Sequence, residues 1–119
     1  MAKIKAFKAI RPENKYANKV ISLPYDVMNR QEASAMAEGN PASFLHICRS
    51  EIDLPEVSDP YAKEVYLKAK DNIDQFIKDG IFMVDEKPCF YIYRQIMDGR
   101  TQTGITLCAS IDDYLENRI

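Results

Sequence analysis

The chain has 119 residues, of which 46% are hydrophobic and 29% charged, the balance of a globular protein large enough for one hydrophobic core. The formal net charge of −2 gives no basic field, so neither nucleic acid nor an anionic membrane surface is an expected partner. No apolar run reaches the ~18 residues of a membrane span, and residues 1–5 lack the apolar core of a signal peptide. The three cysteines are scattered and odd in number, which predicts reduced thiols, no disulfide and a cytoplasmic location.

The first residues predict a strand followed by less regular structure. Residues 4–10 are apolar enough for a strand, which the following Arg-Pro pair would end. The mixed polar residues 13–19 predict a short helical turn or a loop. Residues 20–22 predict a short extended segment before the next turn.

A capped helix and a buried strand are expected next. Asn29 and Glu32 have the spacing of a capping box, in which each side chain accepts a hydrogen bond from the backbone of the other residue. The Gly-Asn-Pro sequence of residues 39–41 ends this helix, because glycine adopts the left-handed cap and proline cannot continue the helix. Residues 44–48 are densely apolar and predict a buried strand, and residues 50–60 predict a surface loop.

The clearest helix signal covers residues 61–79. Asp59 and Pro60 suit its amino terminus, and Gly80 suits its end. Apolar residues recur within it at intervals of three and four, which predicts an amphipathic helix. The side chains expected to be buried are Val65, Tyr66, Ala69, Ile73 and Phe76.

The last third of the chain predicts a hairpin over residues 89–109. Asp98 and Gly99 suit a type I′ turn, which requires positive φ at both central positions. Ser110 is a plausible cap for a terminal helix that starts near Asp112 and has less than two turns before the chain stops. The sequence therefore predicts an α+β fold, with a small mixed or antiparallel sheet and two to three helices, in one N-terminal domain over residues 1–119.

The single histidine, His46, is the first candidate site residue. Its apolar surroundings favour a half-buried structural histidine, and the alternative is a proton carrier or a phosphate contact at a strand end. Cys48 would share its strand face, but no third group that orients a Cys–His couple is evident. One histidine and three dispersed cysteines predict no metal site.

The second candidate site residue is Asp26, in the turn Pro24-Tyr25-Asp26. The ordinary interpretation is a rigid bend in which Asp26 binds nearby backbone amides. The functional alternative places Asp26 at the lip of a cleft, as a ligand contact or a base. The aromatic segment of residues 90–93 resembles a nucleic-acid stacking platform, but the acidic charge balance favours an ordinary half-buried strand.

Five segments, in order, closely resemble the amino-terminal part of one family of prokaryotic proteins, domain of unknown function 1015. They read IKAFKAIRP, LPYDVMNRQEA, GNPASFLHICRSEIDLP, YIYRQIMDGRTQTGI and ASIDDYL, and they extend over essentially the whole chain. Members are several times longer, and their most site-like motif, Asp-Gly-His-His-Arg followed by a helix, lies beyond the last residue of this sequence.

The resemblance implies a small-molecule phosphotransfer enzyme related to the ParB-like nucleotide-dependent kinases, with a ParB-like fold and a link to serine or phosphoserine. It implies that Asp26 and His46 line the site of the full-length protein. It also implies that the nucleotide is bound by the longer protein, and that this piece has no cofactor and is inactive alone. A non-catalytic interaction or oligomerisation module stays open as the alternative.

The expected partners are the remainder of the full-length chain and a second copy of this one. Alternation along the hairpin must send part of each strand to a second face. We therefore expect exposed apolar surface that self-association would cover. The expected contributors are Tyr91, Tyr93, Ile105 and Leu107.

Overall fold

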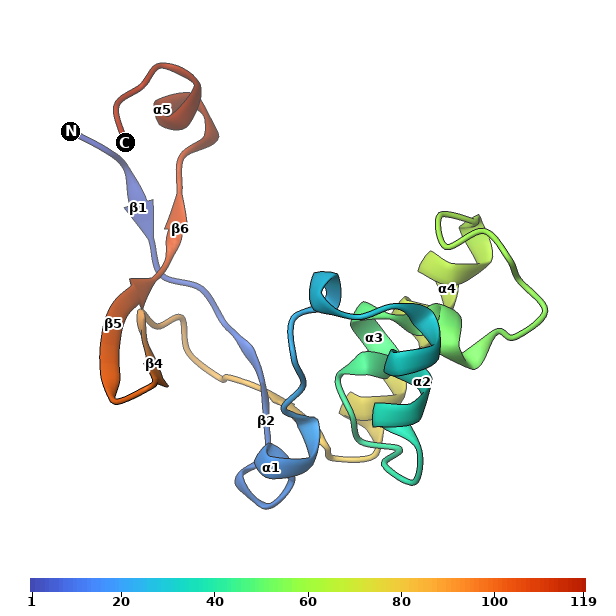
Figure 1. Cartoon of the computed structure of the whole chain (residues 1–119). Coiled ribbons are helices and arrows are strands. Elements are labelled where there is room, and N and C mark those ends of the chain that lie inside the picture. Colours follow the sequence, from blue (N-terminus) through green and yellow to red (C-terminus); the bar gives the residue numbers. More distant parts are fainter. The chain divides into compact units, whose positions relative to one another are not determined.

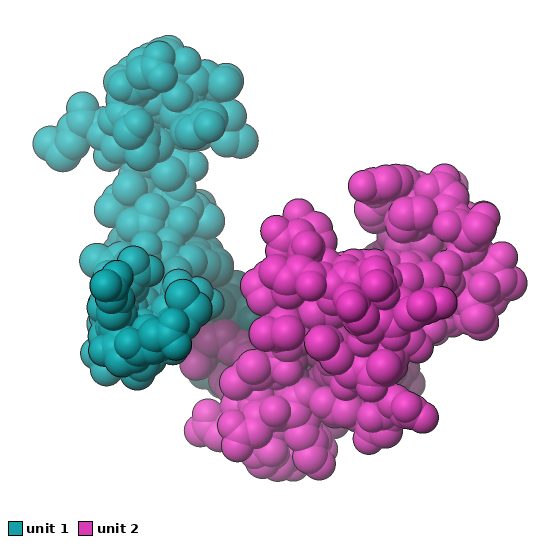
Figure 2. Space-filling view, viewed as in Figure 1, with its two compact units in different colours: residues 1–10, 84–119 teal, residues 11–83 magenta.

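The computed structural model describes all residues 1–119, in two compact units (Figures 1 and 2). One unit consists of residues 11–83, and the other of residues 1–10 with residues 84–119. The predicted α+β class is confirmed, because five α-helices occur with three small two-stranded sheets. The expectation of a single domain over the whole chain stays a prediction, and the two units are described separately below.

The unit of residues 11–83 is mainly helical. Its strands β2 (Ile10–Pro12) and β3 (Phe82–Val84) pair where the chain enters and leaves it. Its α-helices are α1 (Ala17–Val20), α2 (Arg30–Ala37), α3 (Leu45–Cys48) and α4 (Lys63–Lys78). Its 3₁₀ turns are η1 (Asn14–Tyr16), η2 (Tyr25–Val27) and η3 (Ser50–Asp53). Of the helical turn or loop predicted for residues 13–19, the structure has the helical form, whereas Val20, expected in an extended segment, ends α1.

The capping box of α2 is confirmed. Asn29 accepts a hydrogen bond from the backbone of Glu32 over 2.9 Å, and the Glu32 carboxylate accepts one from the backbone of Asn29 over the same distance. The helix ends at Ala37, and Gly39 follows with φ of +71°, as the sequence predicts.

The strand predicted for residues 44–48 is wrong, because this segment contains the helix α3. Ser43 favours the helix by accepting a hydrogen bond from the backbone of Leu45 over 3.2 Å. Leu45 packs in one hydrophobic cluster, with Met28, and Ile47 packs in another, with Phe76. Because this short helix lies between two cores, its sequence is apolar on both sides, and a short apolar run of that kind does not distinguish helix from strand.

The predicted surface loop of residues 50–60 is correct only in its second part. It begins with η3, in which Ser50 and Glu51 are buried. The Ser50 hydroxyl donates to the carbonyl of Val65 over 2.7 Å, and Arg49 pairs with the Glu51 carboxylate. Arg30 donates to the carbonyls of Glu51 and two loop residues, so arginine side chains fix the path of this acidic segment.

Helix α4 is shorter than predicted, and one expected core residue is wrong. The Asp59 side chain accepts from the backbone of Tyr61 in a turn that precedes the helix, rather than capping the helix itself. Val65 and Phe76 are buried, as predicted, whereas Ala69 and Ile73 are only half-buried and Tyr66 is 59% exposed. It lies about 100° around the helix from Val65 and so falls at the edge of the apolar stripe.

The other unit contains two strand pairs and a terminal helix. Strand β1 (Ile4–Lys5) pairs with β6 (Cys108–Ala109), and β4 (Tyr91–Met97) pairs with β5 (Arg100–Thr106), both antiparallel. The single strand predicted for residues 4–10 is therefore divided between β1, an isolated bridge at Phe7 and the first residue of β2. Ser110 caps α5 (Ile111–Leu115), as predicted.

The hairpin of β4 and β5 turns at Asp98 and Gly99, as predicted. Both residues have positive φ, +52° and +74°, which the type I′ turn requires. The register pairs Ile92 with Ile105 and Tyr93 with Gly104. Because successive side chains alternate, Ile105 lies on the same face as Ile92 and on the opposite face from Tyr93.

Candidate functional site

His46 on α3 forms a close pair with Asp53 of η3. Its Nδ1 lies 2.9 and 3.0 Å from the two carboxylate oxygens of Asp53, and its Nε2 lies 3.1 Å from the backbone carbonyl oxygen of Asn40. Both ring nitrogens thus face acceptors, and only the doubly protonated ring donates to both. The side chains of His46 and Asp53 are 20% and 25% exposed, so ligands can reach the pair.

Asn72 connects this pair to α4. Its side-chain amide nitrogen lies 2.6 Å from the backbone carbonyl oxygen of His46 and 3.0 Å from Oδ2 of Asp53. The side chain of Asn40 in turn donates to the carbonyl of Lys19 at the end of α1. Four separate segments therefore fix the orientation of the imidazole ring. A functional group needs such a fixed orientation to act on a ligand.

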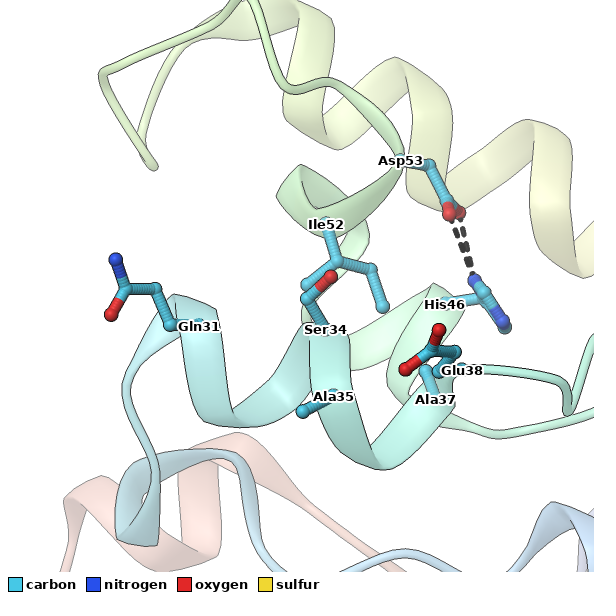
Figure 3. A pocket seen from close by; sticks show the side chains of 8 residues that line it. All are labelled: Gln31, Ser34, Ala35, Ala37, Glu38, His46, Ile52 and Asp53. Atoms are coloured by element: carbon cyan, nitrogen blue, oxygen red, sulfur yellow. Dashed lines mark hydrogen bonds and ion pairs between the residues drawn. The ribbon is translucent and has the colours of Figure 1, made fainter.

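Two pockets share the His46–Asp53 pair as part of their lining. The first, the acidic pocket, has a volume of about 560 Å³. Its lining residues are Gln31, Ser34, Ala35, Ala37, Glu38, His46, Ile52 and Asp53 (Figure 3). Glu38 lines this pocket together with His46 and Asp53 (Figure 3), and the pocket has no lysine or arginine in its lining. The acidic pocket therefore suits a cationic group.

The second pocket, the lysine pocket, has a volume of about 910 Å³. Lys19 of α1 and Lys68 of α4 line it together with His46, Asp53 and Asn72. Its apolar side includes Tyr16, Phe76 and Ile81. Volumes of this size are usual for small-molecule sites in proteins.

The structure places Asp26 elsewhere. This residue is exposed in η2, and it lines neither the acidic pocket nor the lysine pocket. Its turn is held by Arg49, whose Nη1 donates to the carbonyls of Tyr25 and Met28 over 2.9 and 2.7 Å. A neighbouring arginine therefore fixes the bend. The ordinary interpretation of the turn gave this part to the Asp26 carboxylate.

The Cys–His couple considered from the sequence does not form. Because α3 is a helix, positions 46 and 48 point in directions about 200° apart. Cys48 lines a different pocket, next to Arg49 and Tyr25, and burial raises the pKa of its thiol. No group of three or more His, Cys, Asp or Glu residues is placed to hold a metal ion, and no helix has the length and apolarity to cross a membrane.

Sequence reasoning missed several residues of this site. The sequence predicts Asp53 within a surface loop, and no motif distinguishes Lys19 and Lys68 from other surface lysines. Asn72 did carry a signal, because it interrupts the apolar face of α4 one turn before Phe76. A polar residue at such a position needs a partner, and here it binds the site.

One family model matches residues 4–119, and its description is protein of unknown function (DUF1015). This match confirms the family resemblance predicted from the sequence segments. No curated protein and no solved structure matches the chain.

Proposed function

We propose that this chain, which belongs to the DUF1015 family, is the N-terminal ligand-binding domain of a prokaryotic, cytoplasmic enzyme that transfers phosphate to or from serine. The reaction class and the serine link come from the family resemblance, as do the ParB-like fold and the nucleotide bound by the longer protein. In this proposal the chain by itself is inactive, and its pockets bind the small substrate.

The observation that supports the proposal is the position of the His46–Asp53 pair between two pockets of different charge. The acidic pocket contains Glu38, and the lysine pocket contains Lys19 and Lys68. Phosphoserine carries an ammonium group as well as a carboxylate and a phosphate, and complementary charges orient such a ligand. The pair would thus lie near the middle of a substrate that extends into both pockets.

In this proposal, His46 has a defined part in the chemistry. Both ring nitrogens face acceptors within the chain, Asp53 and the carbonyl of Asn40, so we assign His46 to orienting the substrate. Asp53 and Asn72 are positioning residues, because they contact the ring or its backbone. To act as a base, His46 would first have to release the carbonyl of Asn40.

A phosphate-transfer assay with ATP or ADP and serine or phosphoserine tests the proposal on the full-length protein that contains this chain. We expect turnover by the full-length protein, none by residues 1–119, and a loss of about 100-fold or more in kcat/KM for His46→Gln. A full-length protein that binds neither nucleotide nor serine contradicts the proposal.

Asp26 is a proposed site residue on the family resemblance alone. Its exposed position leaves it accessible to other parts of the full-length protein. Asp26→Asn, compared with His46→Gln in the same assay, measures whether the turn contributes to turnover. A loss of activity in both variants supports a shared site, and a loss in His46→Gln alone restricts the site to the two pockets.

The alternative function is a non-catalytic interaction module. One specific observation favours it: Ile92, Ile96 and Ile105 on one face of the β4–β5 hairpin are each at least 70% exposed. Exposed isoleucines on one face are typical of a surface that a partner covers, although Arg94 and Thr103 lie on this face between the Ile92–Ile105 pair and Ile96. In this case, the full-length protein would lack phosphotransfer, and removal of the apolar face would abolish association.

A further inference from the structure

We infer that the lysine pocket binds a small organic anion with an apolar body, whose anionic group is held by Lys19 and Lys68. This inference goes beyond the proposed function, because serine and phosphoserine have no apolar body. It requires only binding, however, and can be tested on this chain without any turnover.

The first argument is the state of the two lysines. Lys19 and Lys68 line one pocket from α1 and α4, and neither ammonium group forms an ion pair or hydrogen bond within the chain. Lys70, on another face of α4, instead pairs with Asp74 over 2.6 Å. The lysines of the pocket therefore remain available to a ligand.

The second argument is that the carboxylates of this pocket are already engaged. Asp53 accepts hydrogen bonds from Asn72 and from the ring of His46. Asp79 accepts one from the side chain of Gln75 over 2.8 Å. Both carboxylates of the pocket thus already have hydrogen-bond donors within the chain, whereas its two lysines have no acceptor.

The third argument concerns the body of the ligand. Tyr16 and Ile81 are partly buried against the same hydrophobic cluster to which Phe76 belongs, and all three residues line the pocket. An apolar group placed there covers carbon surface, and the anionic group faces the lysines. Inorganic phosphate alone would use only half of these contacts.

The test is a titration of the isotope-labelled chain followed by backbone amide resonances. The probes are phenyl phosphate, inorganic phosphate and benzyl alcohol, which separate the anionic group from the apolar body. We expect saturable shifts with phenyl phosphate at the amides of Lys19, Asn40 and Asn72. Binding of the other two probes should be at least about tenfold weaker, because each lacks one class of contact.

Matched variants make the assignment specific. Lys19→Gln and Lys68→Gln should each weaken phenyl phosphate binding about fivefold, a usual size for one partly exposed ionic contact. Lys70→Gln removes the same charge from a different face of α4 and should leave the affinity unchanged. Unchanged amide spectra away from the pocket show that each variant is folded.

Three results would overturn the inference: no saturation with phenyl phosphate, equal binding of benzyl alcohol, or equal weakening by Lys70→Gln. The proposed function fails separately, through an absence of phosphate transfer in the full-length protein. Binding without turnover would support the anion-binding pocket and contradict the phosphotransfer function. Turnover without binding to this pocket would support the phosphotransfer function and contradict the anion-binding pocket.

Discussion

The side-chain amide of Asn72 donates to the backbone carbonyl of His46 over 2.6 Å, and the same nitrogen lies 3.0 Å from the Asp53 carboxylate. One side chain of α4 therefore fixes both the helix that presents the histidine and the carboxylate that orients it. The relationship makes the stability of this unit and the geometry of the candidate site depend on one residue.

Replacement of Asn72 by Ala should lower the free energy of unfolding by about 1–3 kcal/mol, because it removes the side-chain donor to the His46 carbonyl and one of the donors to the Asp53 carboxylate. Urea denaturation measures the change. Asn18→Ala, at an exposed position of α1, is the control and should cost less than about 0.5 kcal/mol. Equal effects of both substitutions would mean that the Asn72 contacts do not stabilise the unit.

The helical form of residues 45–48 has a consequence for core substitutions. Leu45 and Ile47 belong to separate hydrophobic clusters, so Leu45→Ala and Ile47→Ala should each cost about 2–4 kcal/mol and their effects should add. A strand would place both side chains on one face and couple them. Denaturation of the single variants and of the double variant, within a double-mutant cycle, therefore checks the helix, and a coupling energy above about 1 kcal/mol would contradict it.

Local signals in the sequence were sufficient where they involve only neighbouring residues. The Asn29–Glu32 capping box and the Asp98-Gly99 turn are set by short-range geometry, and both occur as predicted. The error at residues 44–48 has a tertiary cause, because the cores on both sides of α3 determine its form. The partners of His46 have the same kind of cause, since His46, Asp53 and Asn72 meet only after three segments pack together.

The turn of the hairpin gives a prediction that the sequence alone already supports. Gly99 has φ of +74°, and a β-branched side chain is strained there, so Gly99→Val should destabilise the hairpin by about 1–3 kcal/mol. Gly104→Ala is the matched control, because its φ is not in the left-handed region and an added Cβ meets no atom within 4 Å. Amide hydrogen exchange across residues 91–106 should accelerate in the first variant only.

The three thiols should differ in reactivity. Burial raises the pKa of the Cys48 thiol above its ordinary value, so less of it is thiolate at neutral pH, and it is also less accessible than the exposed Cys89 and Cys108. Alkylation followed by mass spectrometry should modify Cys48 last, with a rate that rises as pH approaches the raised pKa. Modification of Cys48 at the rate of Cys89 in the folded chain would contradict this order.

We still expect self-association through the β4–β5 hairpin. The register of the two strands determines which of its faces takes part. The sequence pointed to Tyr91, Tyr93, Ile105 and Leu107, but the Tyr91 hydroxyl binds the Asp85 carboxylate over 2.5 Å, and Leu107 is half-buried. Tyr93 and Ile105 are exposed, as expected, but they lie on opposite faces, and Ile105 shares its face with Ile92 and Ile96, which together form the isoleucine face.

Both β4 and β5 also have an unpaired edge, because their sheet has only two strands. A second copy that packs on the isoleucine face around a two-fold axis would cover all three side chains in both copies. We therefore propose that the chain forms a dimer at micromolar concentration.

Light scattering across a concentration series measures the mass of the chain in solution. Ile96→Lys should reduce this mass to that of a monomer, because the substitution places a charge within the apolar contact. Tyr93→Lys makes the same change on the opposite face and should leave the dimer intact. A wild-type chain that stays monomeric at all concentrations, or a dimer that only Tyr93→Lys dissociates, would show that the isoleucine face does not join two copies.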